Sequence, residues 1–205
     1  MVNGMIKRRQ GKSRYLEKSE IRRIIDFQKG NKLHGVRNIC ILTTLSLTGC
    51  RIGELCSLSI GDVINDDGTI KERWVLRKEN TKSKKSHTLY INPILQASVT
   101  AYMNQRKERG ERLLPSKPLF ISQMHGRFTP KSLQITVKIM CKKVGLDEMV
   151  STHSFRRSLI TNLFRSGVDV KTVSTLVNHS NIYITDGYIQ QDEVKLKNVV
   201  NGMRL

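Results

Sequence analysis

Residues 151–190 read STHSFRRSLITNLFRSGVDVKTVSTLVNHSNIYITDGYIQ and carry the strongest functional signal in the chain. This helical-looking stretch holds two histidines, three arginines and two tyrosines. His153 and Arg156 are three positions apart, so on a helix they share one face, with their Cβ atoms about 5–6 Å apart. A solvated basic face is one explanation of this pattern. The other is a site that holds a phosphate and attacks it, because arginine matches phosphate oxygens and histidine carries a proton near neutral pH.

The charge of the whole chain points to a polyanionic partner. Its 205 residues include 36 Lys and Arg against 17 Asp and Glu, a formal net charge of +19. Nucleic acid is favoured, because each phosphate that a basic side chain neutralises releases counterions. A membrane surface is the rival, but no apolar run approaches the roughly 18 residues of a spanning helix, and no secretory segment is recognisable. We therefore expect a cytoplasmic, nucleoid-associated protein with no membrane partner.

The pattern of apolar and helix-capping residues predicts an α+β fold, mainly α-helical with a small antiparallel β-sheet. The apolar runs WVL and TLYI flank a lysine-rich tip, which predicts a β-hairpin. The stretch GVRNICILTTLSLTG is apolar nearly all round, as in a buried helix. Helices are predicted at residues 18–29, within 35–49, just after Gly49, at 93–109, between Pro130 and Gly145, and after Ser151. The four cysteines (Cys40, Cys50, Cys56, Cys141) have no CxxC spacing and are expected to be reduced core residues.

Two parts are predicted along the chain. Residues 1–14, MVNGMIKRRQGKSR, carry five basic and no acidic residues, which favours a flexible arm that lies along DNA. Lys7, Arg8 and Arg9 are its candidate DNA-binding residues. Residues 15–205 show no internal repeat and no long linker, so they are expected to form one domain.

Three further motifs accompany the HSFR cluster at 153–156. The stretch TGCRIGEL places Arg51 at a predicted helix start, where backbone N–H groups favour an anion. His179 follows in LVNHS, and Tyr188 comes nine residues after it. In their order and spacing, these motifs resemble the catalytic domain of the tyrosine recombinases, the integrase family of site-specific DNA recombinases. The resemblance covers nearly the whole chain and implies the fold of that domain.

The resemblance implies that Tyr188 is the nucleophile and becomes joined to the 3′-phosphate of the cut strand. Tyr183 is a competing tyrosine whose spacing from His179 does not fit the family. The same resemblance assigns Arg51, Arg156 and His179 to the negative charge of the phosphorane-like transition state, a role that preorganised cations suit. With arginines in that role no metal or other cofactor is implied.

The resemblance also calls for a lysine on the hairpin, which protonates the departing 5′-oxygen. In TKSKKSHTLYIN the spacing back from the returning strand selects Lys82, with Lys84 and Lys85 as alternatives. His153 is assigned to accepting or orienting the phenolic proton. Lys84, Lys85 and Arg157 are further candidate DNA-binding residues.

The implied function is site-specific cleavage and rejoining of DNA through a covalent 3′-phosphotyrosine, in integration, excision or inversion of mobile DNA. The implied partners are double-stranded DNA, a homotetramer on paired sites and accessory DNA-bending proteins. A DNA-relaxing enzyme of the type IB topoisomerase kind is one alternative, and a DNA-binding regulator or accessory factor with a decayed site is another. The catalytic positions carry residues that are competent for the reaction, which argues against a decayed site. The long segment after Tyr188 argues against a topoisomerase.

The chain departs from the family pattern in three places. Asn178 stands where the family usually has glycine, which is expected to affect backbone geometry more than chemistry. Gly187 directly precedes the nucleophile. We expect a chain without the full helical domain that usually precedes the catalytic domain, a layout similar to small fimbrial DNA invertases and minimal integrases. A truncated chain has the same appearance.

The last segment, residues 192–205, has the spacing of one apolar helical stripe, formed by Leu196, Val199, Val200 and Met203. One possibility is that this helix packs on its own domain. By the family resemblance it instead docks on a neighbouring protomer and links the subunits of the tetramer.

Overall fold

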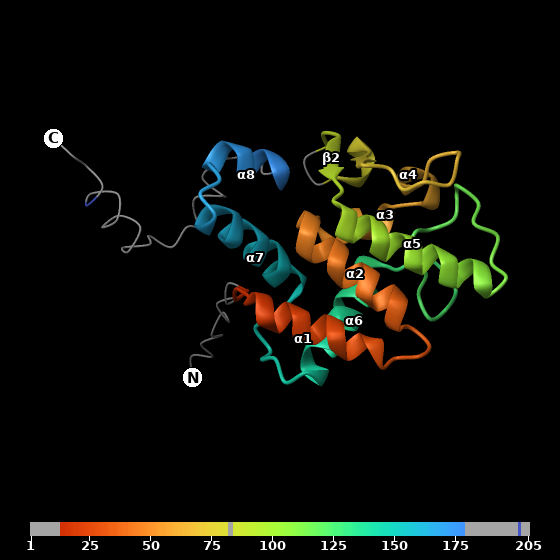
Figure 1. Ribbon diagram of the computed structural model, residues 1–205, viewed down its shortest axis with the longest axis horizontal. Coiled ribbons are helices and arrows are strands. Elements are labelled where there is room, and N and C mark those ends of the chain that lie inside the picture. Colours follow the sequence, from red (N-terminus) through yellow and green to blue (C-terminus); the bar gives the residue numbers. More distant parts are fainter. Residues whose placement is uncertain (1–12, 82–83, 179–200, 202–205) are drawn as a thin grey trace, which may run out of the picture.

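The computed structural model describes residues 13–81, 84–178 and 201, and within them it is mainly helical (Figure 1). The longer helices are α1 (Lys18–Lys29), α2 (Gly35–Thr48), α5 (Pro93–Glu108), α6 (Pro130–Lys143) and α7 (Thr152–Arg165). The shorter ones are α3 (Ile52–Ser57), α4 (Ile60–Val63), α8 (Val170–Leu176) and the 3-10 turn η1 (Lys78–Asn80). A two-stranded antiparallel sheet, β1 (Arg73–Leu76) and β2 (His87–Tyr90), completes the fold. The predicted α+β class is confirmed.

Helix α2 is the centre of the fold. It packs against α1, α5 and α7, and Figure 1 shows it between α1 and α5. Cys40, Ile41, Leu42 and Leu45 on this helix are fully buried. A helix that is apolar on all sides must be covered on all sides, which confirms the buried helix predicted here. The end of α2 leads directly into the TGCRIGEL motif.

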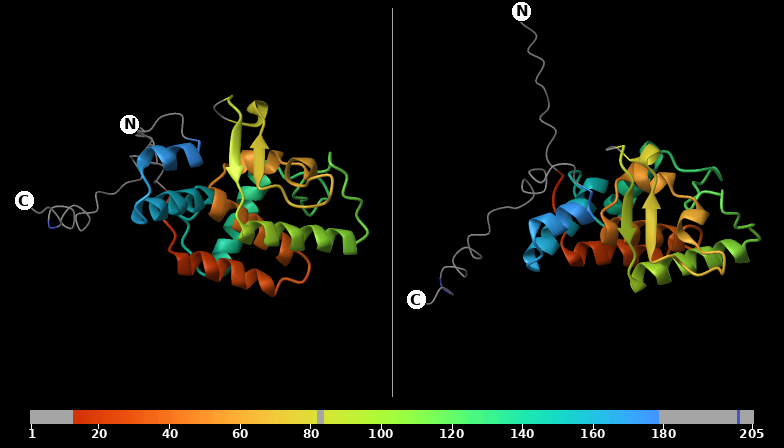
Figure 2. Two further views of the ribbon diagram at one scale, coloured as in Figure 1. Left: turned by 45° about the horizontal axis from the view of Figure 1, so that its top comes forward. Right: turned by 90° about the horizontal axis from the view of Figure 1, so that it is seen from above.

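The hairpin is also confirmed, and its two strands lie side by side in both views of Figure 2. Trp74 pairs with Leu89, and Leu76 pairs with His87. Because side chains alternate between the two faces of a strand, these four residues share one face. Trp74, Leu76 and Leu89 are buried there, and His87 is the half-buried polar member.

The helix ends follow local capping signals. The Thr129 hydroxyl accepts from the Ser132 N–H at 3.1 Å directly before Pro130, and Asn92 caps α5 in the same way before Pro93. Gly145 follows α6 with φ 76°, a left-handed conformation that glycine adopts without strain. Pro93, Pro130 and Gly145 thus lie at the helix boundaries that the sequence predicts.

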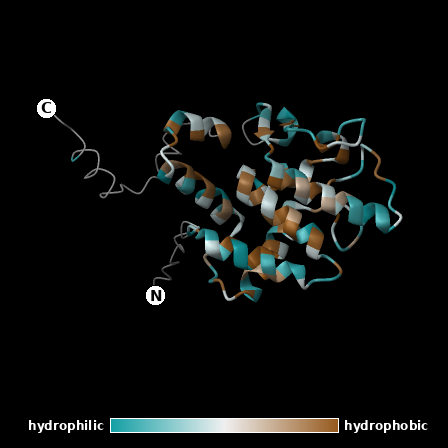
Figure 3. Cartoon of the chain, viewed as in Figure 1, coloured by the Kyte–Doolittle hydropathy of each residue, from teal (hydrophilic) through white to brown (hydrophobic). Residues whose placement is uncertain are grey.

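Figure 3 shows the hydrophilic C-terminal end of α5 at the edge of the molecule. Within residues 13–81, 84–178 and 201, no helix combines the length and the apolarity needed to cross a bilayer.

The four cysteines are buried and none forms a disulfide. Burial raises the pKa of the Cys40 and Cys50 thiols to about 12. Because the thiolate is the reactive form, these residues serve as packing and not as nucleophiles.

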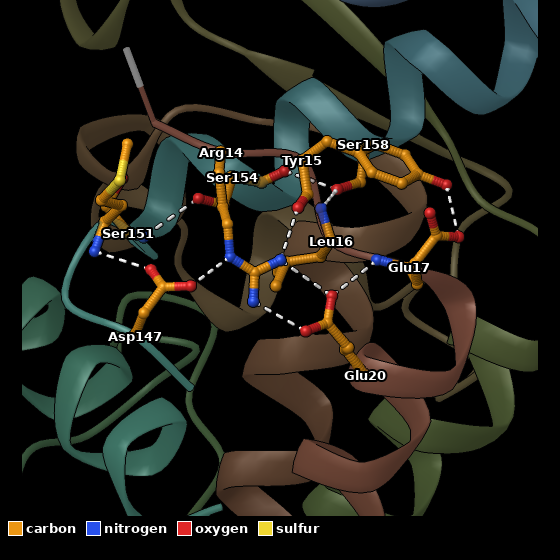
Figure 4. A network of polar contacts seen from close by, with 10 residues as sticks. Arg14, Tyr15, Leu16, Glu17, Glu20, Asp147, Ser151, Ser154 and Ser158 are labelled. Carbon is orange, nitrogen blue, oxygen red and sulfur yellow. Dashed lines mark hydrogen bonds and ion pairs between the residues drawn. The ribbon is translucent and has the colours of Figure 1, made fainter. Parts of the chain in front are cut away.

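A network around Arg14 ties the segment before α1 to the rest of the fold (Figure 4). The Arg14 guanidinium donates to both carboxylate oxygens of Glu20, at 2.9 and 2.7 Å, and also to Asp147. The Leu16 N–H donates to the Ser158 hydroxyl on α7 at 2.7 Å. The Ser13 hydroxyl lies 2.9 Å from the hydroxyl of Ser151, the N-cap of α7. Ser13 and Arg14, the last two residues of the predicted arm, therefore contact the folded body, and residues 1–12 lie outside the described residues. The network braces the start of α7, the helix that carries Arg156.

Arg14→Ala is expected to lower the free energy of unfolding at pH 7 by about 1 kcal/mol, the scale of a partly exposed ion pair. The Arg14 guanidinium holds the pKa of the Glu20 carboxyl below its usual range, against a smaller opposing effect of burial. A lowered pKa in the folded state stabilises the fold above the unfolded pKa, and this contribution disappears as pH falls through the folded value. Denaturant unfolding at pH 7 and at pH 3 should therefore show the deficit at pH 7 shrinking at pH 3. Arg22→Ala, at an exposed position of α1, is the control, and a deficit of equal size at both pH values would contradict the role given to Glu20.

Candidate active site

Two arginines far apart in the sequence converge on one short segment of backbone. Arg51, directly before α3, donates from Nη2 to the carbonyl of Asn178 at 3.2 Å. Arg156, on α7, donates from Nη2 to the carbonyl of Val177. Its Nη1 also donates to the carbonyl of Gly49 at 2.7 Å, at the end of α2. The fold therefore brings together the two arginines that the sequence singles out.

Glu54 orients Arg51. Its carboxylate is buried, and it accepts from the Arg51 backbone N–H at 2.7 Å and from the Arg51 Nη1 at 2.9 Å. The three-residue spacing in TGCRIGEL makes both bonds possible within the first turn of α3. Glu54 thus holds the guanidinium in place, a role that the motif alone does not reveal.

The site carries an excess of positive charge. Arg156 is only 5% exposed, and an ion removed from water is costly unless polar groups surround it. Two guanidiniums against the single carboxylate of Glu54 leave these three side chains with a net charge of +1. Such an arrangement favours an anion, and guanidinium groups match phosphate oxygens in shape and charge.

Gly49 allows the close packing of this cluster. Its φ is 61°, and a Cβ atom here would come within 2.9 Å of the Leu159 side chain and 3.6 Å of the Arg156 Cγ. The glycine of the TGCRIGEL motif is therefore needed both for its left-handed backbone and for the approach of α7 to the end of α2.

Four other candidates lie within the described residues. His153 is exposed on the first turn of α7, one turn before Arg156, as predicted. Lys84 and Lys85 are exposed in the segment that joins the strands. Arg157 is half-buried and donates to the carbonyl of Ser13 at 3.1 Å.

Several predicted residues lie outside the described residues, and their roles stay predictions. They are the general acid Lys82, the loop histidine His179, the nucleophile Tyr188, the competing Tyr183, the arm residues Lys7, Arg8 and Arg9, and all of the tail except the exposed, helical Asn201.

His87 is a residue of this site that the sequence analysis missed. Burial lowers the pKa of its imidazole, the Arg156 and Arg51 guanidiniums act in the same direction, and Glu54 opposes them. The backbone of Leu176, at the end of α8, is its hydrogen-bond partner. The alternation in HTLY places His87 on the same face as Leu89, and this was the signal that could have revealed it.

A large cleft of about 1280 Å³ lies elsewhere, at the other end of α2. About twelve residues of α2 separate Arg37, in its lining, from Gly49, so roughly 18 Å lie between the cleft and the arginine pair. Arg37, Arg106 and Arg127 in its lining donate to backbone carbonyls, those of Ile121, Pro118 and Leu58 among others. These arginines brace the segment between α5 and α6, and the cleft is distinct from the candidate active site.

Asn178→Gly is expected to match or exceed the stability of the natural chain, and to exceed that of Asn178→Ala by about 1–2 kcal/mol. The reason is the left-handed backbone at Asn178, whose φ is 51°. In addition, the Asn178 Nδ2 is buried, and no described residue accepts a hydrogen bond from it. Denaturant unfolding gives the ranking, and the glycine variant should keep the bond from Arg51, because Arg51 contacts only the backbone carbonyl. Equal stabilities of the alanine and glycine variants would show that the left-handed conformation is not required.

The comparisons with known proteins agree with this arrangement. The phage integrase family matches residues 14–194. Tyrosine recombinase XerC of Caldanaerobacter subterraneus subsp. tengcongensis is 29% identical over 167 residues, which cover 80% of this chain and 44% of that protein. Tyrosine recombinase XerA of Pyrococcus horikoshii is 28% identical over 193 residues, covering 93% of this chain and 61% of that protein. The chain thus spans less than two thirds of the length of these curated relatives.

Solved structures show the same fold. The crystal structure of XerA recombinase has a TM-score of 0.72 at 22% identity and covers 93% of this chain and 64% of that one. The XerH site-specific recombinase, in a post-cleavage complex with a palindromic difH substrate, has a TM-score of 0.71 at 18% identity, covering 94% of this chain and 54% of that one. Because the family match spans nearly all of the described residues and includes both arginines of the site, the chain belongs to the phage integrase family.

Proposed function

We propose that this protein is a site-specific DNA recombinase that cuts and rejoins DNA strands through a covalent 3′-phosphotyrosine. The observation that carries the proposal is the convergence of Arg51 and Arg156 on the two carbonyls directly before His179. The names of the matched relatives, and the DNA bound to the XerH structure, support the same class of reaction.

In the proposed reaction, the Tyr188 oxygen forms a bond to the scissile phosphorus, and the bond from phosphorus to the 5′-oxygen breaks. His153 accepts or orients the phenolic proton. Lys82 gives a proton to the departing 5′-oxygen. The phosphodiester bond is exchanged for a phosphotyrosine ester, so its energy is retained. A 5′-hydroxyl from another strand reverses the step, and the exchange needs no nucleotide cofactor.

The arginine pair supplies the electrostatic part of this chemistry. A phenol has an ordinary pKa of about 10, so it is a weak nucleophile near neutral pH. The transition state places additional negative charge on the non-bridging phosphate oxygens. Donors that are already in position at that point lower the barrier without reorganisation, and removal of one such donor typically costs 10²–10³-fold in rate. Glu54 keeps Arg51 in such a position before the substrate arrives.

A covalent protein–DNA adduct tests the proposal even without knowledge of the target site. The protein is incubated with a pool of nicked, randomised duplexes, denatured, and the DNA that remains attached is recovered and sequenced. We expect adducts that survive denaturation, persist in EDTA, and enrich one sequence. A binding protein without catalysis gives no adduct, and an enzyme that only relaxes DNA gives adducts without recombination between two copies of the enriched sequence.

We further propose that the protein acts on DNA in the cytoplasm as a tetramer on paired sites, with accessory DNA-bending proteins as further partners. Deletion of residues 192–205 is then expected to spare binding to a single site but to abolish the paired-site complex and recombination. Native gel electrophoresis with one-site and two-site duplexes measures both properties. A truncated protein that still pairs two sites would show that the tail packs on its own domain.

A further inference from the structure

His87 occupies an unusual position for a polar residue. It is the first residue of β2, pairs with the buried Leu76 of β1, and lies on the inner face of the hairpin with Trp74 and Leu89. It is half-buried, and β2 packs against α8. The imidazole is thus directed away from solvent toward the helices that form the arginine site.

Three helical segments place polar or charged groups around this imidazole. The segment of α3 contributes Arg51 and Glu54, α7 contributes Arg156, and α8 contributes the backbone of Leu176. On the hairpin itself, the residue opposite His87 is the apolar Leu76. Among the described residues, His87 therefore faces two guanidiniums, one carboxylate and one main-chain hydrogen bond.

These surroundings favour a neutral imidazole while the site is empty. Burial is the main reason that the pKa of His87 is lowered. The Glu54 carboxylate and the hydrogen bond to Leu176 oppose this effect, and the two guanidiniums act in the same direction as burial. An anion held by the same guanidiniums reverses the local charge. A nearby negative charge favours the protonated form of histidine.

We propose that His87 takes up one proton from solvent when a phosphodiester anion binds to the Arg51–Arg156 pair, and so becomes a third cationic group of the site. Its hydrogen bond to the backbone of Leu176 keeps the ring in place in both states. The inference rests on the proposed function only in taking the phosphodiester of DNA as the anion.

The proposal has a thermodynamic consequence. A group whose pKa is higher in the complex than in the free protein strengthens binding at low pH. The gain appears as pH falls from the pKa of the complex toward the pKa of the free protein. The gain approaches about tenfold in affinity for each unit that separates the two pKa values.

The first test follows the histidine Cε1–H resonances by NMR between pH 5 and 8, with the His87 signal assigned from His87→Asn. The full chain carries Tyr188→Phe, so that added duplex is not cleaved. Sulfate, which does not titrate in this range, serves as a second probe that needs no recombinase activity. We expect both sulfate and duplex to raise the pKa of His87, and Arg51→Ala to diminish the rise with sulfate. An unchanged pKa of His87 with both probes would overturn the proposal.

The second test compares duplex affinity at pH 8 and pH 5.5 at constant salt. Asparagine at position 87 keeps a side-chain N–H donor but cannot take up a proton, so His87→Asn should lose part of the gain on acidification. His125→Asn is the matched control, because His125 is exposed and lies in the distant cleft, and it should behave as the natural chain. An identical pH dependence in the natural chain and His87→Asn would also overturn the proposal. If adducts never form but sulfate still shifts His87, the proposed function fails and this inference stands.

Discussion

Tyr188→Phe is expected to abolish the covalent protein–DNA adduct while it leaves DNA affinity almost unchanged. The substitution removes a single oxygen, the atom that we propose attacks phosphorus, and without it no phosphotyrosine can form on this residue. Affinity should persist because most protein–DNA contacts are made to phosphates by many basic side chains, and this chain has a net charge of +19. Denaturing electrophoresis measures the adduct, and fluorescence anisotropy measures the affinity.

Tyr183→Phe is the matched control, since the two tyrosines are five positions apart in one segment. It should still form the adduct. If the adduct disappears with Tyr183→Phe and persists with Tyr188→Phe, the nucleophile has been assigned to the wrong tyrosine. Binding of both variants should weaken steeply with salt, as expected for phosphate contacts.

Arg51→Ala and Arg156→Ala are each expected to slow single-turnover cleavage by about 10²-fold or more, the typical loss when a donor to transition-state charge is removed. The two variants should differ in stability. Arg156 is buried, and its loss leaves the carbonyls of Gly49 and Val177 without this donor, at a cost of about 1–3 kcal/mol. Thermal unfolding of each variant shows that the rates are compared on folded protein.

Arg165→Ala is the control for these two, because Arg165 is exposed at the other end of α7, where it contacts Tyr15. It should cleave at the natural rate. Arg51→Lys keeps the charge but loses the planar donor pair, so partial activity is expected. If either arginine can be removed with less than a tenfold loss, the pair does not stabilise the transition state.

Much of the fold could be predicted because its signals are local. Thr129 followed by Pro130 begins a helix, Gly145 ends it, and the largely apolar stretch of α2 requires burial on most of its surface. The hairpin likewise follows from two short apolar runs around a polar tip. These features depend on neighbours within a few residues, which the sequence displays directly.

The contacts of the site could be predicted only in part. Order and spacing identify Arg51 and Arg156, but not that they meet at the carbonyls of residues 177 and 178. The bonds of Arg14 to Asp147 and of Leu16 to Ser158 join segments more than a hundred residues apart, and no local pattern announces them. For His87 the alternation in HTLY predicts an inward-facing side chain, but its neighbours belong to three other elements, which no local pattern identifies.

Mapping the residue that carries the DNA tests the central claim most directly. The adduct is digested with nuclease and trypsin, and the nucleotide-bearing peptide is fragmented by mass spectrometry. Trypsin releases residues 172–195 as one peptide that contains both tyrosines, and fragmentation separates Tyr183 from Tyr188. We predict a nucleotide joined through its 3′-phosphate to Tyr188. A nucleotide on any other residue, or a linkage through a 5′-phosphate, would contradict the mechanism.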